Sequence, residues 1–190
     1  MKLRRPAAVI AAVGIVVSAC SGPALSPSAY AEVIERATDD YIERSQALSV
    51  AFQSTVEQEV ALIVETDVED PVAAAIDVTK REMVLYLALL EDAMGRYIEQ
   101  LSQIAPPESL VQVHDDYVTA VQVVQRGMPE TRASVESAFQ LDGIEAAIAG
   151  SGLQDGQYRL AKTCMSLEAA VRAEGHGLDL GCTRPLTRNG

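Results

Sequence analysis

A long run without proline or glycine limits the fold of this chain most strongly. From residue 28 to about residue 66 the sequence contains neither of these two helix breakers. Apolar side chains recur along the run at mostly three- or four-residue steps, the spacing of one helix face. They are Tyr30, Ile34, Ala37, Tyr41, Leu48, Phe52, Val56, Val60 and Ile63. The run predicts a single helix of about 57 Å that begins near Ser26 or Ser28, where Ser26 can cap it with Pro27 at the first helical position. A helix of this length needs helical partners to bury its stripe.

A second long run follows the first after a short break. It begins at Asp70-Pro71, a pair typical of a helix cap and first turn, and continues to about Ile104. Its apolar stripe is Val72, Ile76, Thr79, Met83, Leu87, Leu90, Met94, Tyr97, Leu101 and Ile104. Because the two runs match in length and the connection is short, they are expected to form an antiparallel αα-hairpin.

The rest of the chain is more fragmented. Pro106-Pro107 starts a third helix with the stripe Leu110, Val113, Tyr117, Val121 and Val124. Gly127–Pro129 interrupts that helix, and residues 130–141 are either a kinked continuation or a separate short helix. Residues 144–149 could add one or two turns, and residues 150–156 are expected to form a loop.

A fourth helix is predicted from Gln157 to Ala173, ended by Gly175-His176-Gly177. His176 is expected to interact favourably there with the helix dipole. The residues predicted to face inward are Leu160, Ala161, Cys164, Leu167, Ala170 and Val171. The sequence therefore predicts an all-α fold, an antiparallel four-helix bundle with a long first αα-hairpin.

The composition favours helices and disfavours two classes of binding partner. Aromatic residues are 4% of the 190 residues and Trp is absent, which is poor material for a β-sandwich. The formal net charge of −12 would be repelled by the phosphate backbone of a nucleic acid, so a nucleic-acid partner is not expected. The same charge disfavours direct adhesion to anionic lipid headgroups.

The first twenty residues have the parts of an export signal. Lys2, Arg4 and Arg5 form a positive start, and the apolar run of eleven residues at 7–17 is shorter than the about 20 needed to span a membrane. The small residues Ser18 and Ala19 then precede Cys20. This segment resembles the lipobox of bacterial lipoproteins. The resemblance implies cleavage before Cys20 and a covalent diacylglycerol on its sulfur.

The predicted organisation follows from that resemblance. Residues 1–19 are the signal peptide, 20–28 the lipidated Cys20 and a flexible tether, 29–182 the helical domain, and 183–190 a frayed tail. Two acyl chains give stable anchoring without a transmembrane helix. The chain is therefore expected outside the cytoplasm on a bacterial membrane, on the outer membrane if Ser21 acts as in Gram-negative lipoproteins. The alternative is an ordinary signal peptide that leaves Cys20 unmodified.

Two cysteines remain after Cys20. Outside the cytoplasm, Cys164 and Cys182 are expected to form a structural disulfide that holds the C-terminal tail. Closing a loop of about 19 residues is worth on the order of 3 kcal/mol in the chain-entropy model. A redox pair usually has closer spacing, and zinc would need more ligands than these two cysteines with His176 nearby.

Two places could bind a cation or cofactor. Asp67, Glu69 and Asp70 crowd one interhelical turn with Glu65, although the spacing is not an EF-hand and no glycine supplies the turn. His114 lies beside the third stripe and could pair with Met83 or Met94 on a haem. Helix capping and core packing explain these residues better than a bound cation or haem does, so no cofactor and no metal are expected.

The end of the chain also resembles uncharacterised secreted bacterial lipoproteins with helical bodies. The shared elements are Pro106, Pro107, His114, Asp115, Cys164, Leu167, Leu180 and Cys182. The resemblance implies a helical bundle with a C-terminal disulfide and brings no activity with it.

The sequence contains no catalytic motif that we recognise, so the expected function is non-enzymatic. The first predicted helix carries many more acidic than basic residues, which could dock a basic protein or cell-envelope component. The alternative is a small-molecule or cation carrier with a pocket between the helices, holding His114 or the turn at 67–70.

Overall fold

The structure is a computed structural model that describes residues 23–66 and 68–182. Its elements are α1 (Pro27–Glu65), α2 (Pro71–Gln103), a short 3-10 helix η1 (Glu108–Leu110), α3 (Val111–Glu136), α4 (Leu141–Ala149) and α5 (Leu153–Ala173). No strand occurs in these two ranges, and the predicted all-α class is confirmed. The described chain has five α-helices instead of four, because residues 137–140 separate α4 from α3.

Both predicted starts of the long helices are confirmed. The Ser26 side chain accepts a hydrogen bond from the Ala29 amide at 3.3 Å, and the Asp70 carboxylate accepts one from Ala73 at 3.0 Å. In each case a proline follows the cap, where its missing N–H costs nothing. The Leu25 amide donates to the Ala105 carbonyl at 3.0 Å, so the end of the expected tether belongs to the folded body.

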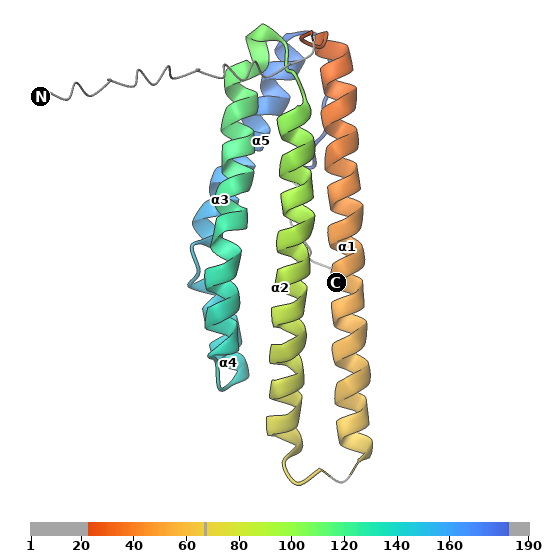
Figure 1. The fold of residues 1–190 in the computed structure, drawn as a ribbon, viewed down its shortest axis with the longest axis vertical. Helices are drawn as coiled ribbons and strands as arrows, with labels where there is room; N and C mark the ends of the chain where they lie inside the picture. Colours follow the sequence, from red (N-terminus) through yellow and green to blue (C-terminus); the bar gives the residue numbers. More distant parts are fainter. Residues whose placement is uncertain (1–22, 67, 183–190) are drawn as a thin grey trace, which may run out of the picture.

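The two longest helices, α1 and α2, run side by side in opposite directions and form a hairpin (Figure 1). Stacked rings of Tyr41 and Tyr97, with centroids 4.9 Å apart, mark one level of the seam. Phe52 and Tyr86, 5.3 Å apart, mark another level nearer the turn. These pairs fix the register of the hairpin, and both fall on the predicted stripes or beside them.

The third helix resolves the alternatives left open at Gly127–Pro129. Helix α3 continues through Pro129 without interruption and ends at Glu136. Pro129 has no N–H to give to the preceding turn, and the Thr131 hydroxyl donates to the Gly127 carbonyl at 2.9 Å in the same region.

The loop predicted for residues 150–156 was too long, because α5 already begins at Leu153. Gly156 is buried inside this helix, where a Cβ would lie 3.2 Å from the Val124 side chain of α3. Glycine was read as a loop signal, whereas here its small size lets α5 approach α3 closely. The end of α5 is as predicted: Gly175 has a φ of 85°, and the Gly175 and His176 amides bond back to Arg172 and Val171.

The core is unevenly distributed along the hairpin. We call residues 27–44 with 87–103 the proximal half, and residues 45–65 with 71–86 the distal half. In the proximal half, α1 and α2 share a buried cluster with α3, α5 and the C-terminal segment; its members include Tyr30, Ile34, Leu101, Val121, Leu167, Val171, Leu178 and Leu180. A smaller cluster of Leu87, Val135 and Ile144 lies next to α4.

The distal half has little of this cover. Within its described residues, Val78 is the only fully buried side chain. The tip of the hairpin extends past α3 and α4 (Figure 1). None of the described helices combines the length and apolar character needed to cross a membrane.

Candidate functional site

Polar side chains meet inside the proximal core in two hydrogen-bonded groups. The Tyr30 hydroxyl lies 3.0 Å from His114 Nδ1, which joins the start of α1 to α3. The Tyr97 hydroxyl lies 2.8 Å from both the Thr38 and the Tyr117 hydroxyls, which joins α1, α2 and α3. Thr38 also donates to the Ile34 carbonyl of its own helix at 2.8 Å. Buried hydroxyls of this kind fix the rotation of each helix, since a turned helix would lose its partner.

Burial controls the ionisation of these groups. Desolvation raises the pKa values of Tyr30, Tyr97 and Tyr117 above the usual value for tyrosine, so all three stay neutral. Desolvation also lowers the pKa of His114, against smaller opposing effects of Asp115 and a hydrogen bond to the Leu101 backbone. With the ring neutral and its proton on Nε2, the Tyr30 hydroxyl donates to Nδ1.

The buried polar groups have partners within the protein. In the described part of the chain, every buried side-chain nitrogen or oxygen has a hydrogen-bond partner. Two hollows, of about 470 and 430 Å³, are open depressions on the surface. Of the residues considered for haem, His114 is bonded to Tyr30, Met94 lies in the main cluster, and Met83 packs against the smaller one. The predicted site at His114 is therefore a packed polar core.

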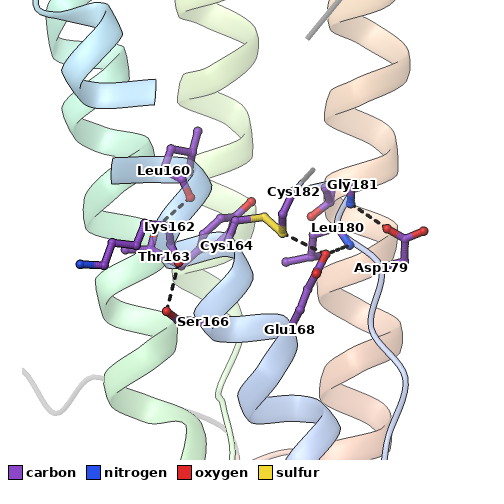
Figure 2. Close-up of a disulfide and its surroundings, with 12 residues drawn as sticks. Leu160, Lys162, Thr163, Cys164, Ser166, Glu168, Asp179, Leu180, Gly181 and Cys182 are labelled. Carbon is purple, nitrogen blue, oxygen red and sulfur yellow. Dashed lines mark hydrogen bonds between the residues drawn. A yellow bond between two sulfur atoms is a disulfide. The ribbon is translucent and has the colours of Figure 1, made fainter. Parts of the chain in front are cut away.

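A second group of interacting side chains lies near the C-terminus, where Cys164 of α5 is joined to Cys182. We call this joint the clasp. The disulfide between the two cysteines is present, with a Cα–Cα distance of 5.6 Å, as the sequence predicted. Glu168, one turn after Cys164, points at the same place (Figure 2). Its Oε1 accepts a hydrogen bond from the Leu180 amide at 2.8 Å and lies 2.9 Å from the Cys182 sulfur. Because a disulfide sulfur carries no proton, the second approach is a close contact and not a hydrogen bond.

Cys164, Glu168 and Cys182 form a possible metal-ligand set by distance alone, with ligand atoms within 4.8 Å of one another. Metal binding requires thiolates, however, and here the two sulfurs are bonded to each other. With the bridge intact, the arrangement acts as a clasp for the tail.

The segment held by this clasp, residues 176–182, is called the C-terminal strap. It has no helical structure and buries Leu178 and Leu180, which are 6% and 4% exposed. Burying two leucines is worth about 3–6 kcal/mol, whereas ordering seven backbone units costs about 7–14 kcal/mol. The leucines alone therefore do not hold the strap, and the disulfide offsets part of the difference by shortening the free chain.

The acidic turn has a structural explanation for one of its members. Asp70 caps α2, and Glu69 is exposed beside it. Asp67 lies outside the described residues, so its position relative to these two carboxylates is not defined. The described part of the predicted turn site is thus a helix cap with a neighbouring surface carboxylate.

The acidic surface of α1 contains an ordered charge pattern. Glu32, Asp39 and Glu43 are exposed and follow one another at seven- and four-residue steps, which places them on one face. We call these three residues the acidic stripe. Among the described residues, one acidic side chain of α1 forms an ion pair. It is Glu59, which contacts Arg81. Arg36 is exposed on the same face, between Glu32 and Asp39, so the stripe and this arginine together carry a net charge of −2. The carboxylates of the acidic stripe remain exposed to a partner of opposite charge.

No family model, curated protein or solved structure matches this chain. Cys20 and the expected signal peptide lie outside the described residues.

Two features were missed at the sequence level. The hydroxyl pairs were not foreseen, although Tyr30, Tyr97 and Tyr117 stand on the predicted apolar stripes, where a buried hydroxyl needs a partner. Glu168 was also missed, although its position four residues after Cys164 puts both side chains on one face of the helix.

Proposed function

We propose that this chain is a non-enzymatic binding module, held by lipid on Cys20 at the outer face of a bacterial membrane. In this proposal it contacts a basic protein or cell-envelope component through the acidic stripe of α1. We further propose that α1, α2, α3 and α5 act together as one antiparallel four-helix bundle, with α4 as part of a connection.

The observation that carries this proposal is the filled interior. The proximal core uses its polar groups on one another, and the two hollows described above are open surface depressions. Ligand sites for small molecules are usually concave and enclosed. A chain whose interior is packed in this way has its outer surface available for recognition.

Charge supports the acidic stripe as the contact surface. The whole chain carries −12, and removal of residues 1–19 would take away three basic residues and no acidic one. Such a surface accelerates encounters with basic partners, and the attraction weakens as salt increases.

A charge-reversal pair tests the acidic stripe. The triple variant E32K/D39K/E43K is compared with E130K/E136K/E145K, which reverses three exposed carboxylates of α3 and α4 and changes the net charge equally. In pull-downs from envelope extract, the first variant should lose a partner that high salt also releases from the parent. The second variant should keep it. Equal loss in both variants, or no loss in either, would contradict the proposal.

The anchor has a separate test. Replacing Cys20 with Ser should move the protein from the membrane fraction to the soluble fraction or leave it unprocessed, with a mass change that reports the missing lipid. A variant with unchanged fractionation and unchanged processing would rule out the lipid on Cys20.

The alternative proposal is a small-molecule or cation carrier, and it has less support. Its two predicted sites hold His114, which is bonded to Tyr30, and Asp70, which caps α2. Metal analysis and an absorbance spectrum of the purified protein test it, because a bound metal or chromophore at one equivalent would favour the carrier.

A further inference from the structure

The C-terminal strap differs from every other part of the buried core in how its backbone is held. The helices that surround it satisfy their own backbone groups internally. In the strap, the Leu180 amide donates to the Glu168 side chain at 2.8 Å, and the Gly181 amide donates to the Asp179 side chain at 2.9 Å. These partners are side-chain carboxylates, so the two amides are not held by a backbone ladder with a neighbouring element.

The two ends of the strap are suited to movement. Gly175 precedes it with a φ of 85°, and Gly181 lies next to the bridge with a φ of 68°. Both values are in the left-handed region that glycine enters without steric cost. The stretch between them has no helical structure, and Figure 2 shows it passing beside α5 toward the disulfide. The segment can therefore swing without unwinding a helix.

The strap covers apolar surface of the main core. Leu178 and Leu180 belong to the same buried cluster as Ile34 of α1 and Leu167 and Val171 of α5. Those three side chains are fully buried in the closed form. Lifting the strap would uncover apolar surface next to α1 and α5.

We propose that the C-terminal strap is a redox-controlled cover, closed by the Cys164–Cys182 bond and released when a dithiol reductant cleaves it. The reductant's two thiols become a disulfide, and the two electrons and two protons pass to the cysteines as two thiols. Cys182 is partly exposed whereas Cys164 is 5% exposed, so attack takes place at the Cys182 sulfur and Cys164 leaves first as the thiolate. This device is independent of the acidic stripe.

Glu168 influences how fully the strap opens after the disulfide is reduced. Its carboxylate holds the Leu180 amide in the closed form, and this hydrogen bond does not depend on the bridge. The neutral amide of Glu168→Gln accepts a weaker hydrogen bond than a carboxylate does. The strap of this variant should stay closed while the bridge is intact and open more fully on reduction.

Hydrogen exchange of the full chain, with and without dithiothreitol, tests the proposal. The peptide that contains Leu178–Gly181 should lose at least tenfold of its protection on reduction and recover it on reoxidation, while α1 and α3 keep theirs. The C164S/C182S variant should match the reduced parent, and Glu168→Gln should show a larger loss than the parent. Circular dichroism should report unchanged helix content throughout.

Two outcomes overturn the proposal. If reduction lowers protection across α1 and α3 as much as in the strap, the disulfide stabilises the whole fold and does not control the strap alone. If the strap keeps its protection after both sulfurs are shown to be free thiols, other contacts hold it and the bond does not control it.

Discussion

The proximal and distal halves of the α1–α2 hairpin have similar apolar stripes but different surroundings. In the proximal half, α3, α5 and the C-terminal strap cover the hairpin and bury residues such as Tyr30, Ile34 and Leu101 completely. In the distal half, the helices rely mostly on each other: the stripe residues Phe52, Val60 and Ile63 are only partly buried, and Val72 is 67% exposed. A periodic stripe therefore predicts a helix, whereas the neighbouring elements decide how deeply that stripe is buried.

The two halves are also suited to different tasks. The proximal half is fixed by long-range polar pairs, a bridge and a packed core, so it sets the structure of the molecule. The distal half extends away from those contacts (Figure 1) and presents side chains on more than one side. Stability should consequently be concentrated at one end of the hairpin.

The largest expected difference between the halves is in the cost of removing a leucine. Leu101→Ala empties a completely buried position and should lower the free energy of unfolding by about 3 kcal/mol. Leu48→Ala removes a partly buried residue of the distal stripe and should cost about 1 kcal/mol. Urea unfolding monitored by circular dichroism measures both. Similar losses of unfolding free energy in the two variants would contradict the proposed difference between the halves.

A smaller difference is expected for the tyrosine hydroxyls. Tyr97→Phe leaves the buried Thr38 and Tyr117 hydroxyls without their shared partner, which should cost about 1–3 kcal/mol. Tyr86→Phe is the matched change in the distal half, where the ring packs against Phe52, and should stay within about 0.5 kcal/mol. If the two substitutions destabilise the chain equally, the hydroxyl network does not stabilise the proximal core.

The smallest effect is expected from pH. Burial lowers the pKa of His114 in the folded chain, so the unfolded chain takes up this proton more readily. The stability that depends on a neutral His114 ring is fully present above the unfolded-state pKa of about 6.5. It declines as the pH falls toward the lower pKa of the folded state. The Tm should therefore fall between pH 7.5 and pH 5, and His114→Gln should reduce that slope. An unchanged slope would show that His114 does not titrate as its burial predicts.

The sequence predicted the elements well because their signals are local. Ser26-Pro27, Asp70-Pro71 and Gly175 each define a helix end through neighbouring atoms. The Cys164–Cys182 bridge was also predictable, since these are the two cysteines left after Cys20.

Features that depend on helix rotation were not predictable in the same way. Tyr30 and His114 are 84 residues apart, and their contact requires α1 and α3 to be placed and turned correctly. The role of Gly156 was misjudged for a related reason, because only the position of Val124 shows that the glycine is a packing contact. Most of the features that the sequence did not predict therefore depend on contacts between residues that are far apart in the chain.

Native-state hydrogen exchange along α1 tests the central claim most directly. Amides around Ile34 should exchange only through global unfolding, with the highest protection in the helix. Amides around Leu62 should exchange through a partial opening that leaves the proximal half folded, and so with much lower protection. Equal protection along the whole of α1 would contradict the account, because it would mean that both halves of the hairpin unfold as one unit.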